Sequence, residues 1–399
     1  MDADTTVPPP SLRNARIALV HDWLNGRRGG EKCLEVLCEA FPNATIHTLL
    51  HAPGAAGPTI DGMRIKTSPL QQLPGVSRYY RALLPLMPAA ARGWDVGEVD
   101  LVVSFSHCVA KSVRVPKGVP HVCYCFTPMR YAWSGRDAYL DKLPRLSPRR
   151  FLATKLLDRL RTWDQTTARG VTHFIAISET VRARIQACYH RSSALIYPPV
   201  DVDFYSQSTT ARDDFYLVVS ALVPYKRVDH AIQACESLGK PLVIIGDGPE
   251  RARLESSAGA TTRFLGWQDD AVLRDHFRRC RALLFPGEED FGIVPVEALA
   301  CGAPVIALGR GGVAESVNRD VGYLYDQPTI ESLRAAILAW ESQASSHDPS
   351  ISRARALRFS RERFRNELLS FLAGVLRQNG DIPNFHLRPS IAPALNRRS

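Results

Sequence analysis

The sequence predicts an α/β protein made of two facing, Rossmann-like domains with a deep cleft between them. The 399-residue chain is long enough for two ordinary domains with full-sized cores. Runs rich in Val, Ile and Leu alternate with helical patterns in both halves, which is typical of parallel sheets covered on both faces. Two prolines interrupt this pattern within 194–205, where we place the boundary between the domains.

The expected strands fall into two sets, one for each domain. In the first half they are 16–23, 99–106, 121–126 and 172–178. In the second half they are 215–222, 241–248, 262–267, 282–287 and 304–309. The last strong helical pattern covers 360–378 and ends at Asn379-Gly380.

We therefore divide the chain into an N-terminal domain, 1–200, and a C-terminal domain, 201–360. Residues 1–14 are expected to be flexible, and 381–399 to form a weakly ordered tail. The helix at 361–380 is expected to cross back to the N-terminal domain. Ligands of doubly wound folds bind beyond the carboxyl ends of the strands, so the functional motifs should follow strands.

Composition and charge narrow the class of protein. Hydrophobic residues make up 45% and charged residues 23%, as in folded globular proteins. No apolar run approaches the roughly 18 residues needed to cross a bilayer, and the acidic, proline-rich start does not resemble a secretory signal. Nine scattered cysteines without a CxxC pair predict no disulfide or metal framework and suit a reducing cytoplasm. The formal charge of +10 indicates anionic partners.

The stretch SALVPYKRVDHAI, at 220–232, follows an expected strand and opens a helix. Lys226 and Arg227 then lie near the N-terminus of that helix. Cations beside the free N–H groups of a helix start form a receptor for a diphosphate. The alternative is that both side chains are solvated surface charges.

The stretch GEEDFGIVPVEALACGAPVIA, at 287–307, combines a strand end, a loop and a helix start. Pro295 suits the first turn of a helix, and a glycine in the loop lets a ligand approach the backbone closely. The N–H groups expected to face the cleft belong to Phe291, Gly292, Ile293 and Val294. Glu297, in the same first turn, is placed to accept hydrogen bonds from vicinal hydroxyl groups, as a carboxylate that holds a ribose would. Alternatively, Glu289 and Glu297 only stabilise the helix start electrostatically.

Several motifs together resemble the retaining family-4 glycosyltransferases of the GT-B fold. They are YKRVD at 225–229, GDGPE at 246–250, and Glu289 and Glu297 followed by EALACGAPVIA. Members of that family transfer a sugar from a nucleoside diphosphate to an acceptor hydroxyl and retain the anomeric configuration. The resemblance spans nearly the whole chain. It implies that Lys226 holds the diphosphate, Glu297 the ribose and Glu289 the hydroxyls of the transferred sugar, while the amides of 291–294 bind the sugar and the distal phosphate.

One position departs from the family pattern. Many members have an arginine a few residues before the lysine, whereas Ala221 occupies this region here, and Arg227 is the nearest substitute. Because Glu297 is assigned to the ribose, no second carboxylate is evident for a double displacement of the glycosidase kind. We expect attack on the face from which the diphosphate leaves, with Lys226 stabilising the developing charge. No carboxylate cluster for Mg²⁺ is present, so no metal and no other cofactor is expected.

The stretch HDWLNGRRGGEKCLEVL, at 21–37, follows the first expected strand. Its glycines do not form GxGxxG, so the nicotinamide fingerprint is absent. Gly29 and Gly30 open a helix and offer amides to a phosphate, and the resemblance places such a loop between donor and acceptor; loop flexibility alone is the alternative. His107 ends another strand, and a histidine there contacts the donor sugar in similar enzymes. A lone histidine is otherwise a structural hydrogen-bonding group.

The stretch CFTPMRYAWSGRDAYL, at 125–140, contains a TPMRYAW segment that resembles one in bacterial mannosyltransferases that build polysaccharide repeat units. Arg130, Tyr131 and Trp133 are expected to line the acceptor pocket, because aromatic faces and guanidinium groups suit sugars and phosphates. Plain packing beneath the cleft is the alternative. The resemblance makes GDP-mannose our choice of donor, with a UDP-sugar as runner-up.

Two segments of the N-terminal domain suggest contact with a membrane. Residues 78–94 combine apolar bulk with arginines, and 142–161 hold seven basic residues and one acidic residue among Leu and Phe. Basic amphipathic segments lie on anionic bilayers, although a solvated helix face gives the same pattern. We therefore expect a polyprenyl-diphosphate-linked saccharide acceptor, a role in cell-surface polysaccharide (exopolysaccharide) synthesis, and a peripheral location on the cytoplasmic face of the cell membrane.

Three rival functions remain. A nicotinamide-dependent oxidoreductase shares the doubly wound fold but lacks the fingerprint after the first strand. A nucleic-acid-binding protein would explain the charge, yet none of the usual modules is present, so no nucleic acid partner is expected. Among transferases, the nearest competitor is an enzyme that uses a UDP-sugar and a soluble sugar acceptor.

Overall fold

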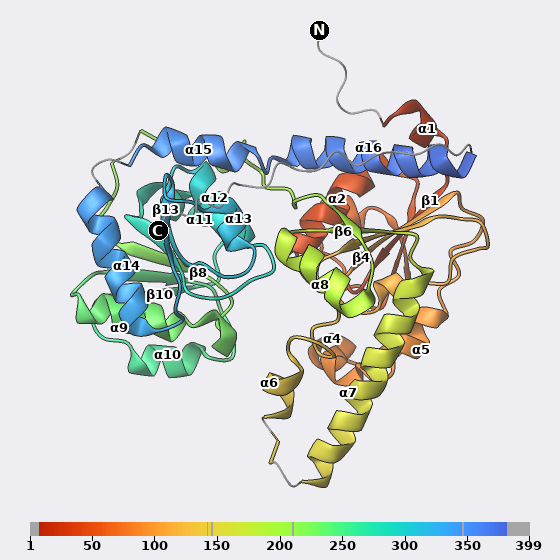
Figure 1. The fold of residues 1–399 in the computed structure, drawn as a ribbon, viewed down its shortest axis with the longest axis horizontal. Helices are drawn as coiled ribbons and strands as arrows, with labels where there is room; N and C mark the ends of the chain where they lie inside the picture. Colours follow the sequence, from red (N-terminus) through yellow and green to blue (C-terminus); the bar gives the residue numbers. More distant parts are fainter. Residues whose placement is uncertain (1–7, 142, 145–146, 210, 345–346, 381–399) are drawn as a thin grey trace, which may run out of the picture.

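Two α/β domains, each built around one parallel sheet, form the computed structural model, which describes residues 8–380 apart from 142, 145, 146, 210, 345 and 346 (Figure 1). The N-terminal sheet has seven strands in the order β3-β2-β1-β4-β5-β6-β7, all parallel. The strands are β1 (Ile17–His21), β2 (Thr45–Thr48), β3 (Arg64–Thr67), β4 (Leu101–Ser106), β5 (His121–Cys125), β6 (His173–Ala176) and β7 (Ser193–Leu195).

The C-terminal sheet has six parallel strands in the order β10-β9-β8-β11-β12-β13. They are β8 (Tyr216–Val219), β9 (Leu242–Ile245), β10 (Thr262–Gly266), β11 (Ala282–Phe285), β12 (Val305–Leu308) and β13 (Gly322–Tyr325). Two doubly wound parallel sheets confirm the fold class predicted from the sequence.

Helices connect successive strands in both domains. In the N-terminal domain they are α1 (Pro10–Arg13), α2 (Gly29–Ala40), α3 (Pro58–Asp61), α4 (Val76–Tyr79), α5 (Met87–Arg92), α6 (Arg136–Leu140), α7 (Pro148–Thr167) and α8 (Glu179–Tyr189). In the C-terminal domain they are α9 (Val228–Ser237), α10 (Arg251–Ser257), α11 (Asp270–Arg279), α12 (Ile293–Ala300), α13 (Val313–Ser316) and α14 (Ile330–Gln343). The short 3₁₀ helices are η1 (Pro69–Gln72), η2 (Tyr80–Leu83), η3 (Ala110–Ser112), η4 (Ala168–Gly170) and η5 (Pro224–Lys226). No helix in the described part of the chain is both long and apolar enough to cross a membrane.

The last two helices run over both domains (Figure 1). α15 (Pro349–Leu357) packs against α12, whereas α16 (Arg361–Gly380) packs against α1 and α2. Phe364 of α16 meets the Tyr124 ring of β5, with the ring centroids 5.5 Å apart. Within the stretch 1–14, for which we expected flexibility, residues 10–13 form α1 and Leu12 is fully buried. Residues 1–7 and the expected tail 381–399 lie outside the described residues.

The strand order of each sheet reverses beside the first strand of its domain. β1 lies between β2 and β4, and β8 lies between β9 and β11. At such a switch point the chain leaves neighbouring strands in opposite directions, which opens a crevice beyond their carboxyl ends. The loops after β1, β4, β8 and β11 are therefore the places where each domain can receive a ligand.

Four strands are absent from the set that we predicted from apolar runs. β2 and β3 read TIHT and RIKT, and every residue of β3 is at least partly exposed. β7 and β13, which read SAL and GYLY, are equally short and have partly exposed residues. β3, β7 and β13 end their sheets and β2 lies next to β3, so these strands lack the continuous apolar pattern of a strand buried on both faces.

Three buried histidines in the N-terminal sheet, His21, His47 and His121, have pKa values lowered mainly by burial and make stability depend on pH. Burial, with the Lys111 cation nearby, lowers the pKa of His121 to about 3, and its Nε2 lies 2.8 Å from Ser104 Oγ. Burial lowers the pKa of His47 to about 4, with a smaller contribution from Lys66. Both values lie below the ordinary histidine pKa of 6.5, so the unfolded chain binds more protons than the folded chain between pH 6.5 and 4.

We therefore expect the free energy of unfolding to fall as the pH is lowered from about 6.5 to 4. Denaturant titrations at a series of pH values measure this slope. His121→Gln removes one of these histidines and should flatten the slope. A slope that stays the same in His121→Gln would contradict this assignment.

Candidate active site

A cavity of about 820 Å³ lies between the two domains, and both switch points open into it. It is lined by residues that follow β1, β4 and β5 in one domain and β8, β10 and β11 in the other. Most of the predicted site residues line it: Gly29, Gly30, His107, Arg130, Lys226, Glu289, Phe291, Gly292, Ile293, Val294 and Glu297. The predicted residues that do not line it are Arg227, Tyr131 and Trp133.

Lys226 ends the short helix η5 in the loop after β8, and its Nζ is paired with Glu289 Oε1. Both side chains are more than two-thirds buried, and both line the cavity. The two loops approach each other so closely that a Cβ added at Gly287 would lie 3.0 Å from Lys226 Cα. Lys226, predicted to hold the diphosphate, and Glu289, predicted to hold the sugar, therefore lie next to each other in the cavity.

The start of α12 faces the same cavity. Gly292 is its N-cap residue, with a φ of +87° that favours glycine, and no side chain caps the helix. The first N–H groups of an α-helix have no partner inside the helix, so those of Ile293 and Val294 remain available to an anion. Lys226 and this helix start converge as the motifs predicted.

Glu297 lies one turn further along α12 than we predicted. It is the fifth residue of the helix, so it belongs to the second turn rather than the first. Its Oε1 accepts a hydrogen bond of 2.8 Å from Lys32 Nζ of α2, and its side chain is only 5% exposed. This ion pair joins the two domains across the cleft.

The loop that carries Glu289 is held by two glycines after β12. Gly312 N donates to Glu289 O at 2.9 Å, and Gly311 forms a bridge with Glu289. A Cβ at Gly312 would overlap the backbone of Asp290 and Phe291. Only glycine fits this position because the obstacle is main chain rather than a movable side chain.

Gly312→Ala should therefore displace the loop, lower the melting temperature and reduce activity. Overpacking of this kind costs about 1–3 kcal/mol. Calorimetry and a transfer assay measure both effects. Gly374→Ala in α16 is the matched control, because a Cβ there meets nothing within 4 Å. Wild-type melting and turnover in Gly312→Ala would show that the loop is not fixed by this contact.

His107 is held by Asp22, which directly follows β1. The fully buried Asp22 carboxylate accepts from four successive backbone N–H groups, those of His107, Cys108, Val109 and Ala110, at 2.6–2.9 Å. His107 Nδ1 lies 3.0 Å from Asp22 Oδ2. Burial alone raises the pKa of Asp22, but the contacts with His107 and the nearby His21 together outweigh burial and hold the pKa well below its usual range. Asp22 is thus a fixed anion that turns the Nε2 edge of His107 away from itself.

Asp290 joins the domains beside the cavity. Arg130 Nη2 donates to its Oδ2 at 2.5 Å, and Arg184 is paired with its Oδ1. Ser178 Oγ donates to the Asp290 main-chain oxygen at 2.5 Å. Glu315 adds a second contact of this kind, since its carboxylate accepts from the N–H groups of Glu179 and Thr180 at the start of α8.

Three predicted residues lie elsewhere for identifiable reasons. Arg227 has a left-handed backbone with φ of +49°, and its Nη1 is buried without a hydrogen-bond partner among the described residues. Tyr131 packs in the core of the N-terminal domain. Trp133 Nε1 donates to buried Asp164 at 2.8 Å. The positions of Tyr131 and Trp133 agree with the alternative given above, in which these side chains pack beneath the cleft. Ala221 lines the cavity, whereas Arg227, the nearest substitute for the missing cation, does not.

Four residues that hold the site together were not singled out in the sequence: Lys32, Asp22, Asp290 and Gly312. Each acts through a partner far along the chain, such as the 265 positions that separate Lys32 from Glu297. Trp267, in the loop after β10, is 75% exposed and also lines the cavity. Its only sequence signal is its place directly after a strand. Among the described residues, no group of three or more His, Cys, Asp or Glu is arranged to hold a metal ion.

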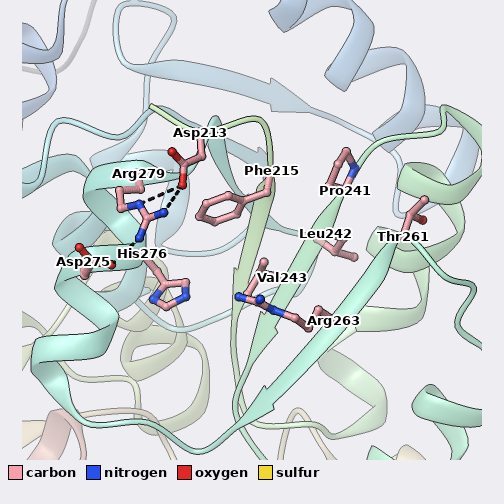
Figure 2. Close-up of a pocket in the computed structure, with 10 residues that line it drawn as sticks. All are labelled: Asp213, Phe215, Pro241, Leu242, Val243, Thr261, Arg263, Asp275, His276 and Arg279. Carbon is pink, nitrogen blue, oxygen red and sulfur yellow. Dashed lines mark hydrogen bonds and ion pairs between the residues drawn. The ribbon is translucent and has the colours of Figure 1, made fainter. Parts of the chain in front are cut away.

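A second cavity, of about 360 Å³, opens at the amino ends of β8, β9 and β10 (Figure 2). Figure 2 shows Arg279 directed toward Asp213 and Asp275, with which it forms ion pairs. The cavity lies at the opposite end of the sheet from the switch point. Of its two arginines, Arg279 is already paired with two carboxylates, and the cavity lies away from the carboxyl ends of the strands, where ligands of doubly wound folds bind.

Two family models match the two halves of the chain. One described as "Glycosyltransferase Family 4" matches residues 27–204, and one described as "Glycosyl transferases group 1" matches residues 202–357. Among solved structures, sucrose-phosphate synthase from Thermosynechococcus elongatus has a TM-score of 0.67 at 15% identity, covering 91% of this chain and 99% of that one. The Anabaena HepE protein in complex with UDP-glucose has a TM-score of 0.64 at 19% identity, covering 90% and 99%.

The two facing domains and these structural neighbours show the GT-B fold. Within that fold class, the chain belongs to the family-4 glycosyltransferases, because the two family models together cover residues 27–357. The family and fold that the motifs resembled are confirmed.

Curated relatives match shorter stretches. The GDP-mannose-dependent alpha-(1-6)-phosphatidylinositol dimannoside mannosyltransferase of Mycobacterium tuberculosis is 30% identical over 158 residues, which are 38% of this chain and 41% of the relative. The O-antigen chain mannosyltransferase C of Escherichia coli is 30% identical over 118 residues, which are 28% of this chain and 32% of the relative. The matches thus span less than half of the relatives' own length.

Proposed function

We propose that the protein transfers mannose from GDP-mannose to a lipid-linked saccharide, with retention of the anomeric configuration, in the synthesis of a cell-surface polysaccharide. The observation that carries the transferase reaction is the shared cavity in which Lys226, Glu289 and the uncapped start of α12 meet. A diphosphate placed there accepts hydrogen bonds from the N–H groups of Ile293 and Val294 and from Lys226.

In the proposed reaction, the acceptor hydroxyl attacks the anomeric carbon from the face on which the diphosphate leaves. The C–O bond to the diphosphate breaks as the new glycosidic bond forms, and the leaving phosphate oxygen takes the hydroxyl proton. Lys226 and the helix start stabilise the charge that develops on the diphosphate, and this stabilisation needs no metal. Glu289 and His107 hold hydroxyls of the transferred sugar, and Glu297 holds the ribose. Trp267 offers an aromatic face on which the nucleobase can stack.

Two of the relatives above support mannose as the sugar, since their names specify mannosyltransferases and one specifies GDP-mannose. The competing reading is a UDP-sugar with a soluble acceptor, which the UDP-glucose complex of a structural neighbour favours. Thermal-shift measurements with GDP-mannose, UDP-glucose and UDP-galactose distinguish the donors. A larger stabilisation by a UDP-sugar than by GDP-mannose would replace the donor proposed here, and no stabilisation by any of them would overturn the function.

The lipid-linked acceptor is supported by the surface of the N-terminal domain. α7 projects away from the sheet (Figure 1), and its first half exposes Phe151 and Leu152 to 63% and 69%. The helix also carries Arg149, Arg150, Lys155, Arg159 and Arg161. Apolar side chains beside cations suit an anionic bilayer, where each cation contributes about 1 kcal/mol. Lys142 and Arg145, which belong to the same basic segment, lie outside the described residues.

We expect the variant Phe151→Ser/Leu152→Ser to bind vesicles of anionic lipid more weakly than the wild type. Both side chains are largely exposed, so the fold should be unaffected. Cosedimentation with phosphatidylglycerol vesicles measures binding, and pure phosphatidylcholine vesicles are the control. Equal binding of the variant and the wild type would remove α7 from the proposed membrane contact.

A further inference from the structure

The two walls of the cavity between the domains carry opposite charge. On the C-terminal side, the only lysine or arginine among the described lining residues is Lys226, and it faces five carboxylates: Asp269, Asp270, Glu289, Asp290 and Glu297. The N-terminal side contributes one carboxylate, Glu31, and four cations: Arg27, Arg28, Lys32 and Arg130. A dianionic or trianionic ligand that docks on α12 therefore meets a net negative wall behind it and a positive wall in front.

Of the four cations, two are already committed to other partners. Arg27 is paired with Glu35 at 3.2 Å, and Arg130 with Asp290 at 2.5 Å. Arg28 lies on the exposed rim of the cavity. Lys32, like Arg130, reaches the far wall: it projects from α2, and its Nζ donates to Glu297 Oε1.

Lys32 is held firmly in this position. Its side chain is 19% exposed, and its Nζ lies 5.7 Å from the centroid of the Tyr205 ring. Burial by itself lowers the pKa of Lys32, but the Glu297 carboxylate more than offsets this and keeps it above its usual value. The side chain is therefore a charged group at neutral pH. It engages one oxygen of Glu297, and Oε2 makes no hydrogen bond with the described residues, which leaves that oxygen for a hydroxyl.

The close approach of α2 to α12 makes this contact possible. Gly29, at the start of α2, lies so near α12 that a Cβ there would be 2.5 Å from Ile293 Cδ1. The N-termini of both helices thus line the cavity close to one another, and an N-terminus is the positive end of a helix dipole. In a nucleoside diphosphate, the first phosphate is attached to the 5′ carbon of the same ribose whose 2′ and 3′ hydroxyls face the carboxylate, so the charge of Lys32 acts on that phosphate through space rather than by direct contact.

We propose that Lys32 is a nucleotide-binding residue, which orients Glu297 from across the cleft and supplies positive charge to the diphosphate of the donor. The inference rests on the proposed function and deepens it: the C-terminal domain holds only part of the donor site, and closure of the domains completes it. The ligand class is a nucleoside diphosphate, with or without its sugar.

Lys32→Gln tests the charge, because glutamine can still donate a hydrogen bond to Glu297 but is neutral. Isothermal titration of the full-length protein with GDP and UDP should show a loss of affinity of about 10- to 100-fold, the range for a lost hydrogen bond to a charged group. Binding of guanosine and uridine, followed by saturation-transfer NMR, should change less than about twofold, because a nucleoside carries no phosphate. Lys117→Gln, an exposed charge before β5, is the matched control and should bind as the wild type does.

An unchanged diphosphate affinity in Lys32→Gln, or an equal loss for nucleoside and nucleoside diphosphate, would overturn the inference. If the wild type binds neither GDP nor UDP, the proposed function itself fails, so the two failures are distinguishable. If Lys32→Gln does not fold, a measurement on the wild-type protein tests the same inference. GDP or UDP should slow the acylation of Lys32 in the wild type but not that of Lys117, as read by mass spectrometry, and equal rates would contradict the assignment.

Discussion

Lys226→Ala should reduce the turnover of sugar transfer by roughly 10²–10³-fold while the protein stays folded, the usual loss when one preorganised electrostatic group is removed from an active site. Lys226 is the cation of the C-terminal wall, and it stands beside the helix start on which the diphosphate is proposed to dock. Charge develops on the leaving group during bond cleavage, so the loss should appear in kcat as well as in KM. Initial rates with GDP-mannose over a range of concentrations measure both.

The control for Lys226→Ala is Arg334→Ala, which removes an exposed cation from α14 of the same domain. It should leave turnover unchanged. Glu289→Ala and Glu297→Ala should also lose most activity, because one holds the sugar and the other the ribose in the proposed complex. If both Lys226→Ala and Glu297→Ala turn over about as fast as the control Arg334→Ala, the proposed active site is wrong.

Asp164→Asn should destabilise the N-terminal domain by about 3–5 kcal/mol, the usual effect of removing one charge of a buried ion pair. Asp164 is fully buried and paired with Lys111, which is 2% exposed. The same carboxylate accepts hydrogen bonds from Trp133 Nε1 at 2.8 Å and from the Tyr189 hydroxyl at 2.7 Å. Burial alone lowers the pKa of Lys111, yet the Asp164 carboxylate keeps it above its usual value, so the variant leaves a buried cation without a counter-charge.

A double-mutant cycle separates the ion pair from the other contacts of Asp164. Asp164→Asn/Lys111→Met removes both charges and should recover much of the lost stability, since replacing a whole buried pair is often nearly neutral. Urea denaturation followed by the fluorescence of the six tryptophans measures the free energy of unfolding of each variant. If the double variant is no more stable than Asp164→Asn, the cost lies in the hydrogen bonds to Trp133 and Tyr189 rather than in the charge.

Sequence patterns identify the strands that build the centre of each sheet, because a parallel strand buried on both faces requires a continuous apolar run. β1, β4, β8 and β11 are of this kind, and the motifs that follow them converge on one cavity. β2 and β3 do not carry such runs, because strands toward the edge of a sheet need not be apolar on both faces. The start of α12 was likewise predictable from its glycine and proline, although Glu297 proved to lie in the second turn.

Contacts across the cleft could not be predicted, because they depend on how the two domains are placed. In the sequence, Lys32 is one charged residue of an amphipathic helix. Its contact with Glu297 becomes evident only when the positions of α2 and α12 are known. Trp133 belongs to the segment that we expected to line the acceptor pocket, but its indole N–H needs a partner when buried and donates to Asp164. Arg227 has a left-handed backbone, with a φ of +49°, and an arginine in the sequence does not predict this conformation.

A crystal structure of the protein with GDP-mannose tests the central claim most directly. The account predicts diphosphate oxygens within hydrogen-bond distance of Lys226 Nζ and of the N–H groups of Ile293 and Val294, with the ribose against Glu297. A donor bound in the cavity of Figure 2, or one whose diphosphate touches neither Lys226 nor the start of α12, would contradict it.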